Sequence, residues 1–325
     1  MNLSEYLLNG RQFTAFSPLK NELQFQDNKN YLFELSYLSS LQIEGERAAE
    51  FLQGQLSCDI RKVTTNTMQQ GAMCNLKGRI LALLDVLQWQ NLQLILPGDL
   101  LVDTQNSLSK TAMLSRIQLK PSTDYQFCGF YLTNKNDLLP TLSLPEAAFA
   151  VTETRESCIY HLGNHFYLIL IKKEFAEAFK QPFIDKEQMR GSLAWHLLQL
   201  HNKRVEIYPQ TRGLFLPHRL DLHLSGYLNF NKGCYKGQEI VARTHYRAKL
   251  KHGLQVFTIE TKETLSAGKR LFAAGTETEM GEIIDYCPLG DERYLIAASI
   301  LLEHPDEVLI EEHKNSVLLK DYEGI

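Results

Sequence analysis

The chain has 325 residues, enough for two or three domains, and its 44% hydrophobic and 22% charged residues are typical of a globular protein with a sizeable core. The formal net charge of −4 argues against a chain coated with basic residues for nucleic acid, so any anion-binding site must be local. The N-terminus shows no basic region followed by a long apolar run, and no apolar run is long enough to span a membrane. These features predict a cytoplasmic protein with no membrane contact.

The six cysteines are isolated from one another: Cys58, Cys74, Cys128, Cys158, Cys234 and Cys287. Without a C-x-x-C pair or a tight Cys/His cluster, neither a disulfide framework nor a structural zinc site is expected. His218, Asp221 and His223 lie close together, but no second cluster accompanies them, so they do not predict a metal site. We expect reduced thiols and no bound metal.

Between residues 31 and 125, extended and helical patterns alternate. Aliphatic and aromatic runs predict strands at 31–36, 38–45, 79–89 and 91–96. Helical spacing predicts helices within 45–56 and 97–119. This alternation predicts an α+β layer with helices on one face of a sheet.

A weaker copy of this rhythm follows from about residue 126 to residue 245. Strands are predicted at 126–133 and 165–173, and a helix at 186–205. The helix prediction rests on one apolar stripe at helical spacing, made by Met189, Leu193, Leu197 and Leu200. Residues 203–233 are irregular and polar, which is typical of a functional or disordered loop.

After about residue 250 the pattern changes to short alternating runs separated by glycines and charged turns, with no helical stripe. Such runs predict a small all-β unit that hides its edge strands by closing into a barrel.

The segment NKGCYKGQEIVARTHYRAKLK, residues 231–251, carries the most unusual chemistry. Between residues 232 and 251 it has six basic residues and one acid, Glu239, which predicts a local anion site or, with equal weight, a solvated basic linker. Gly233 and Gly237 flank Cys234 and would allow a positive φ and a close backbone approach. Positive surroundings favour the reactive thiolate of a cysteine, although a lone cysteine is more commonly a small buried hydrophobe. Gln238 and Glu239 together suit the donors and acceptors of a polar heterocycle.

This segment resembles the signature of the YgfZ family of folate-binding proteins, which are relatives of the glycine-cleavage T-protein and of a mitochondrial iron–sulfur assembly factor. The resemblance rests on KGCYKGQEIVAR and extends to IEGERAAEFLQGQLSCDI, CNLKGRI, AWHLLQLHNKRVEI and LFLPHRLDLHLSGYLNF. By these motifs it covers roughly residues 38–252.

The resemblance implies a duplicated, ferredoxin-like α+β folate-binding module, T-protein-like, over residues 1–247, with halves of about 1–125 and 126–247. A C-terminal β-barrel over 248–325 would follow. The implied cofactor is tetrahydrofolate or a derivative. The implied role is support of iron–sulfur cluster assembly or repair and thereby of tRNA modification. Partners would be iron–sulfur enzymes or assembly proteins, and any tRNA contact would be indirect.

The resemblance also places a folate-contacting tryptophan at Trp195. On a helical wheel Trp195 lies about 200° from Leu193, off the core stripe, so it must face solvent, another domain or a ligand. The alternative is that Trp195 packs against the second half of the duplication. A second aromatic contact that the family has near Leu38 is missing.

Further site residues follow from the motif. The basic segment would bind the folate through Lys232, Tyr235, Gln238, Arg243 and Arg247. Asn75, Lys77 and Arg79 could hold an anionic group such as the glutamate tail, because arginine suits carboxylates, or could instead form a polar hairpin turn with Gly78. Cys234 is the candidate nucleophile or thiol donor, with Glu239 as proton carrier.

One departure from the T-protein bears on activity. Where the T-protein branch has an acid a few positions after its glycine pair, this chain has Ala82 and Leu83, and the next acid, Asp85, is displaced along the strand. This argues against aminomethyl transfer. A folate-dependent one-carbon transferase, a non-catalytic adaptor and an RNA-binding protein remain open alternatives to the folate-binding support role.

Overall fold

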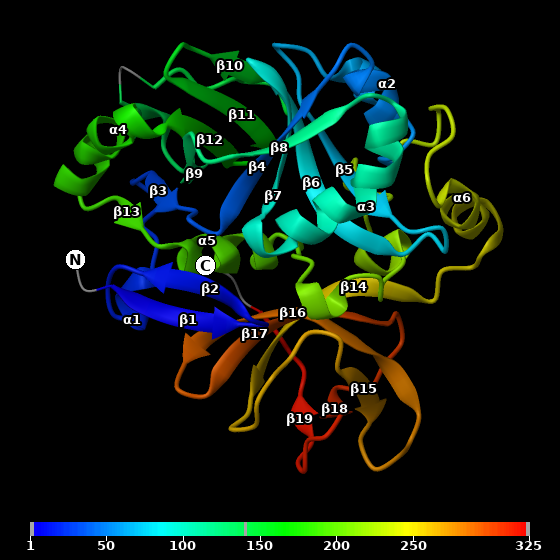
Figure 1. Cartoon of the computed structure of the whole chain (residues 1–325). Coiled ribbons are helices and arrows are strands. Elements are labelled where there is room, and N and C mark those ends of the chain that lie inside the picture. The colour runs from blue at the N-terminus through cyan, green and yellow to red at the C-terminus, as the bar shows by residue number, and fades with distance from the viewer. Residues whose placement is uncertain (1–2, 140–141, 323–325) are drawn as a thin grey trace.

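The computed structural model describes residues 3–139 and 142–322, whose strands form a hairpin and three larger sheets (Figure 1). The N-terminal hairpin, absent from the sequence predictions, pairs β1 (Ser4–Leu8) with β2 (Arg11–Ala15). Among the described residues, no helix combines the length and the apolar character needed to cross a bilayer.

The first sheet has the strand order β5-β6-β7-β4-β8. Its strands are β4 (Leu38–Glu44), β5 (Gln69–Cys74), β6 (Ile80–Trp89), β7 (Asn91–Pro97) and β8 (Gln118–Ser122). Helices α2 (Ala48–Gln53) and α3 (Leu101–Leu114) contribute to the core on one face of it. Both predicted helices therefore exist, but each is shorter than its predicted range.

The second sheet has the order β10-β11-β12-β9-β3-β13. Its strands are β3 (Tyr31–Glu34), β9 (Tyr125–Tyr131), β10 (Val151–Glu153), β11 (Ser157–Gly163), β12 (Phe166–Lys172) and β13 (Met189–Arg190). Helix α4 (Lys173–Asp185) packs on its outer face. Because β3 pairs with β9, an N-terminal strand completes the sheet of the second half.

The seven C-terminal strands form one sheet in the order β19-β18-β15-β16-β17-β14-β20. They are β14 (His252–Glu260), β15 (Arg270–Ala273), β16 (Glu279–Gly290), β17 (Arg293–Leu301), β18 (Glu307–Ile310), β19 (Val317–Leu318) and β20 (Lys320–Asp321). Strands β19 and β20 lie at opposite ends of this order although a single residue separates them in the chain, so the sheet curls until its edges nearly meet. The prediction of a barrel-like β unit is confirmed.

Helix α5 (Ser192–His201) lies at the centre of the molecule, between the sheets and the barrel (Figure 1). Its Leu193, Leu197 and Leu200 join the core shared by the first sheet and the barrel, whereas Trp195 joins the core between the two sheets. Because α5 is enclosed on several sides, nearly all of its faces are apolar. The single apolar stripe predicted from the sequence therefore covers only part of its buried surface.

The predicted helix at 186–205 is wrong at its N-terminal end. Met189 belongs to β13, which pairs in parallel with β3, and Gly191 has the extended conformation (φ −79°, ψ 175°) at the N-cap. A strand pairing with residues far away in sequence overrides the local helical spacing here.

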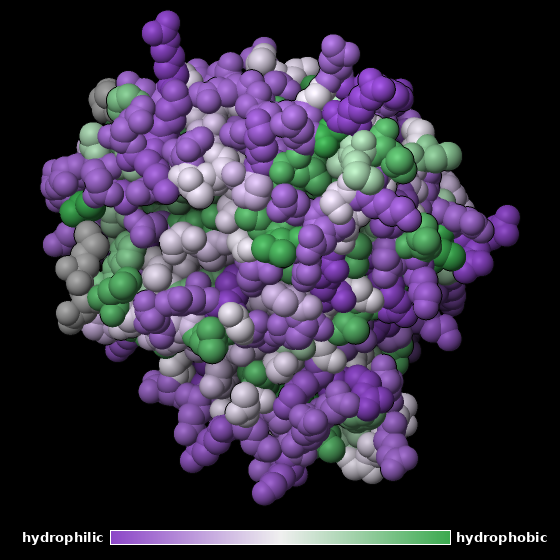
Figure 2. Space-filling model, in the orientation of Figure 1, coloured by the Kyte–Doolittle hydropathy of each residue, from purple (hydrophilic) through white to green (hydrophobic). Residues whose placement is uncertain are grey.

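The remaining elements are short or peripheral: α1 (Leu19–Glu22), α6 (Gln238–Arg247), and the 3₁₀ turns η1 (Ile60–Lys62), η2 (Gly98–Leu100), η3 (Lys135–Asp137), η4 (Pro209–Thr211) and η5 (Pro217–Leu220). Between α5 and α6 the chain has no strand or α-helix, as predicted for 203–233. Helix α6 projects at the edge of the molecule, and hydrophilic side chains cover most of the face seen in Figure 2.

Candidate functional site

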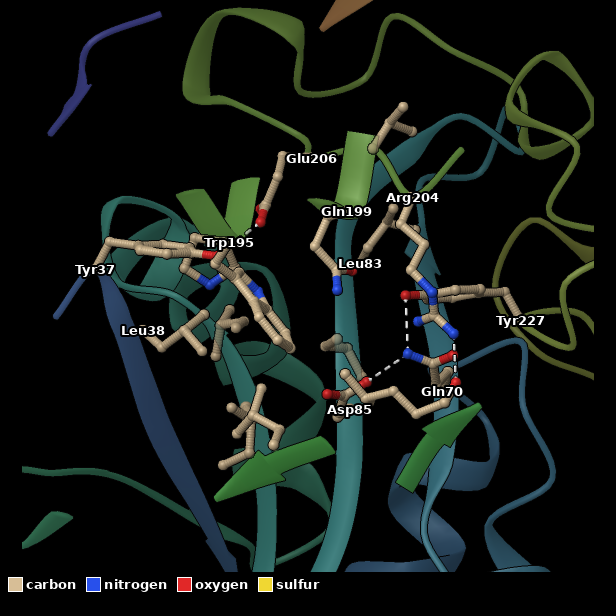
Figure 3. Close-up of a pocket in the computed structure, with 17 residues that line it drawn as sticks. Tyr37, Leu38, Gln70, Leu83, Asp85, Trp195, Gln199, Arg204, Glu206 and Tyr227 are labelled. Atoms are coloured by element: carbon tan, nitrogen blue, oxygen red, sulfur yellow. Dashed lines mark hydrogen bonds between the residues drawn. The ribbon is translucent and has the colours of Figure 1, made fainter. Parts of the chain in front are cut away.

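A cavity of about 90 Å³ lies between the first and second sheets, beside α5 (Figure 3). Residues from β6, α5, the segment after α5 and the loop before α6 converge on it, including Asp85, Trp195, Gln199, Arg204 and Tyr227. This enclosed volume holds a few water molecules and is too small for a whole folate, so a bound folate would also occupy space outside it.

Trp195 lines this cavity but is largely enclosed by protein. It is only 2% exposed, and its ring centroid lies 5.4 Å from each of Phe33 and Phe166. Gly129 of β9 lies so close to the indole that a Cβ on this residue would overlap with Cε3 of Trp195. The alternative in which Trp195 packs against the second half is therefore the one observed, and only part of the indole remains for a ligand.

Asp85 is a buried carboxylate in the cavity. Its Oδ1 accepts a hydrogen bond from Nε2 of Gln70 at 3.0 Å, and its Oδ2 accepts one from the hydroxyl of Tyr160 at 2.9 Å. Burial raises the pKa of Asp85 to about 6, although both hydrogen bonds oppose this shift. Asp85 can therefore accept further hydrogen bonds as a carboxylate above pH 6 and is protonated in acid.

The T-protein resemblance predicts an acid near Ala82 and Leu83, and Asp85 lies further along β6. Residues two apart on a strand face the same side, and Leu83 and Asp85 both line the cavity. Asp85 therefore supplies a carboxylate to the cavity, although it is displaced along β6 from Ala82 and Leu83.

Gln199 provides a donor without a partner. Its Nε2 is buried and makes no hydrogen bond within the described part of the chain. A buried, unpaired amide N–H costs free energy, which a ligand acceptor would recover. No sequence motif indicated Gln199. It could have been predicted only from its position four residues after Trp195, which places the two side chains on the same face of α5.

A second aromatic residue does reach the cavity, next to the position where the family's contact is missing. Tyr37, which precedes Leu38, lines the cavity, and its hydroxyl donates to Oε1 of Glu206 at 3.0 Å. Arg11 of the N-terminal hairpin donates to Oε2 of the same carboxylate at 2.7 Å. These contacts fix one wall of the cavity.

The cysteine motif forms a second region, and none of its residues lines the central cavity. Nζ of Lys232 donates to the carbonyl oxygens of Gln53, Leu56 and Cys58 at 2.6–2.8 Å. All three ammonium donors are thereby used. The prediction that Lys232 binds the cofactor does not agree with this geometry, in which Lys232 anchors the loop after α2.

Tyr235 and Gln238 also hold the loop together. Tyr235 is 6% exposed, its ring lies 5.1 Å from the ammonium of Lys232, and its backbone N–H donates to Oε1 of Gln238 at 3.1 Å. Neither side chain faces a ligand site here, so their predicted cofactor contacts have no support in the geometry.

The other motif residues face outward. Cys234 is exposed, whereas the five other cysteines are buried. Glu239, Arg243 and Arg247 are exposed on α6, of which only Val241 is buried. Cys234 is therefore not the small buried hydrophobe of the alternative reading, and it lies on the outer surface, away from the central cavity.

The two glycines of the motif differ. Gly237 has φ +85°, and a Cβ there would overlap with the carbonyl oxygen of Asn75, so the expected close approach is confirmed. At Gly233 a Cβ would meet nothing within 4 Å and φ is not positive, so that part of the prediction is wrong.

The close approach at Gly237 packs the loop onto the turn of residues 75–79. Oδ1 of Asn75 accepts hydrogen bonds from the backbone N–H groups of Lys77 and Arg79, and Gly78 has φ +70°. The hairpin-turn alternative therefore describes Asn75. Lys77 is exposed, and the guanidinium of Arg79 donates to the carbonyl of Leu214. A contact of Lys77 or Arg79 with a folate tail stays a prediction.

The chain is similar to known proteins both by sequence and by structure, although no family model matches it. The tRNA-modifying protein YgfZ of Colwellia psychrerythraea is 24% identical over 231 residues, 70% of this chain and 71% of that protein. The proteins of the same name from Hamiltonella defensa and Yersinia pestis are 27% and 26% identical, covering 71% and 77% of this chain and 70% and 76% of their own.

Among solved structures, glycine cleavage system aminomethyltransferase T of Bartonella henselae superposes with a TM-score of 0.74. The match covers 98% of this chain and 93% of that chain at 14% sequence identity, so it shows the fold alone. The predicted T-protein-like fold with a C-terminal barrel is confirmed. By sequence, the chain resembles the YgfZ family over most of its length, and by structure it has the fold of aminomethyltransferase T.

Proposed function

We propose that this protein binds tetrahydrofolate or a close derivative in the central cavity and acts in tRNA modification in the cytoplasm, by supporting iron–sulfur enzymes. The resemblance to the YgfZ family supplies the ligand class and the role. The observation that carries the proposal is the cavity itself, where the carboxylate of Asp85 and the unpaired amide of Gln199 meet apolar walls.

These groups suit the polar edge of a pterin. Such a ring presents both donors and acceptors on one edge of a flat aromatic body. Asp85 would accept from the donors, Gln199 would donate to an acceptor, and Leu83, Leu168 and the accessible part of Trp195 would contact the faces. Most of a folate would extend out through the cavity opening, since the enclosed volume is too small for the whole molecule.

Calorimetric titration with tetrahydrofolate tests the site. The wild type is expected to bind, and Gln199→Leu to bind about tenfold more weakly, because one hydrogen bond to the ligand is lost. The substitution removes no hydrogen bond that Nε2 makes within the protein, so the fold should persist. Gln118→Leu, on exposed β8, is the matched control and should bind as the wild type does. No heat from the wild type, or equal affinity in Gln199→Leu, would contradict the assignment.

Cys234 would act separately from the folate, as an exposed thiol toward a partner protein or a reactive group. Its exposure and the neighbouring exposed arginines, Arg243 and Arg247, support this division, with Glu239 nearby as the only acid of α6. The same surface would serve an adaptor with no reaction of its own.

If the thiol of Cys234 acts apart from the folate, its loss should impair function in cells without weakening folate binding. In cells that lack the native protein, Cys234→Ser should fail to restore iron–sulfur enzyme activity and tRNA modification, while the purified variant binds tetrahydrofolate normally. Gly233→Ala is the control, because a Cβ there meets open space and leaves the thiol intact. Full restoration by Cys234→Ser would rule out chemistry at this thiol and leave only docking.

A further inference from the structure

Three histidines meet where helix α6 packs against η5, and none of them lines the central cavity. His218 belongs to η5, His223 to the loop that follows it, and His245 to the last turn of α6. The ring centroid of His218 lies 4.9 Å from that of His223 and 5.7 Å from that of His245. The centroids of His223 and His245 are 6.1 Å apart. We call these three residues the histidine cluster.

His218 is the enclosed member of the cluster. It is 2% exposed, and neither of its ring nitrogens has a hydrogen-bond partner among the residues that the structure describes. On the side of α6, His245 packs beside it and stacks on Phe230 at a centroid distance of 3.9 Å. A protonated imidazole carries a charge and two N–H donors, so its burial without acceptors costs much more free energy than burial of the neutral ring. The site therefore favours neutral His218.

The basic groups around His218 also oppose a proton on it. A charge on His223 or His245 would repel a charge on His218 at these distances. Arg219 is the next residue of η5, and residues 249–252 border the same cavity as His218 and contribute two lysines and a histidine. Positive charge thus approaches from η5, from α6 and from the segment that leads into β14.

The nearby acids are engaged with other groups or exposed. Glu282 is paired with Arg219 at 2.9 Å. Oδ2 of Asp221 accepts a backbone N–H of β14 at 2.9 Å, and its charge acts on His223, whose pKa is nevertheless lowered by burial. Glu303 is exposed after β17. Within residues 3–139 and 142–322, none of these carboxylates accepts a hydrogen bond from His218.

The pKa of His218 agrees with this geometry. Burial, followed by the charges of His223 and His245, lowers it from 6.5 to about 4. A state in which water reaches the ring binds the proton more tightly than the closed state does. The stability that neutral His218 gives to the closed state is therefore fully present above pH 6.5 and is lost as the pH falls toward 4.

We propose that protonation of His218 releases the C-terminal end of α6 from η5, so that the histidine cluster acts as a pH-sensitive switch of this helix. Of the residues of α6, only Val241 is buried, so few other contacts hold the helix in place. Its start is fixed, because Gly237 packs directly on Asn75. The movement is therefore expected near His245. The switch does not depend on folate, since the cluster lies outside the central cavity.

Hydrogen exchange of the backbone amides of α6 tests the switch. Protection factors, which are corrected for the intrinsic effect of pH on exchange, are compared at about pH 7.5 and about pH 5. The protection of residues 244–248 should fall about 30-fold at the lower pH, the ratio expected for pKa values of about 4 in the closed state and 6.5 in the open state. The core strand β17 should lose much less protection, because the opening is local.

His218→Leu removes the titrating ring together with its two unpaired nitrogens. The variant leaves no unpaired polar atom at this position, so the fold should persist and α6 should be equally protected at both pH values. His165→Leu is the matched control, because the same change at an exposed histidine between β11 and β12 should leave the pH response of the wild type unchanged. Equal protection of α6 in the wild type at both pH values, or the same decrease in His218→Leu, would overturn the proposal. A parallel loss in β17 would indicate global unfolding and would overturn it too.

An NMR titration of the wild type checks the same event without a substitution. The imidazole signals of His218 and the amide signals of the last turn of α6 should change over one pH range, below 6.5. Protonation of His218 with no change in the amide signals of α6 would contradict the switch, as would a change in α6 that follows another histidine.

Discussion

Replacement of Lys232 by methionine is expected to lower the free energy of unfolding by about 3–5 kcal/mol. Burial lowers the pKa of the Lys232 ammonium to about 8, so it remains mainly protonated at pH 7 and carries all three donors. Methionine fills similar space but leaves the carbonyl oxygens of Gln53, Leu56 and Cys58 without this donor. Chemical denaturation of both proteins at pH 7 measures the difference.

Lys236→Met is the matched control, because the same change four residues away removes a side chain that makes no hydrogen bond or ion pair with the residues that the structure describes, while the backbone bond from Lys236 to Gly54 remains. It should cost less than about 1 kcal/mol. If Lys232→Met were as stable as this control and instead bound folate more weakly, Lys232 would be a ligand residue, as its sequence motif suggested.

Trp195→Ala is expected to destabilise the protein by about 3–5 kcal/mol, because it opens a large void between the two sheets. The indole is enclosed by Phe33, Phe166 and Gly129, so most of its surface contacts protein and not a ligand. Denaturation again gives the magnitude. A cost below about 1 kcal/mol would indicate an indole face that is free for stacking.

A double-mutant cycle makes this test specific. Gly129→Ala alone should cost about 1–3 kcal/mol through overpacking against Cε3 of Trp195. In the Trp195→Ala background the same methyl group enters the void and should cost nothing or stabilise. Additive effects would contradict the direct contact between the two residues.

Much of the fold follows from local patterns. Aliphatic and aromatic runs predicted β6, β7 and β12, and the change to short alternating runs after residue 250 predicted the barrel, because such patterns are local properties of the chain. Strands β1, β2, β5, β8, β10, β11 and β13 and helices α1, α4 and α6 were not predicted. Strand β13 is too short to show periodicity, and it is stabilised by pairing with β3, more than 150 residues earlier in the chain.

In the candidate site, too, some features follow from the local sequence and others depend on tertiary contacts. The motif predicted correctly that Gly237 has a positive φ, whereas the exposure of Cys234 is known only from the structure. It also grouped Lys232, Tyr235 and Gln238 with the ligand residues, although their side chains point into the protein. Adjacent residues of an irregular loop can face opposite directions, and which side is solvent depends on the α2 loop and the 75–79 turn that pack against it.

The sequence by itself determined the classes of secondary structure, the C-terminal β unit, the resemblance to the YgfZ family and the basic character of the segment around Cys234. Only the tertiary structure decided that Asp85 and Gln199 meet at the central cavity and that Trp195 is mostly enclosed. The reason is physical. Periodicity and charge are properties of neighbouring residues, whereas burial and unpaired donors depend on contacts between segments that are far apart in the chain.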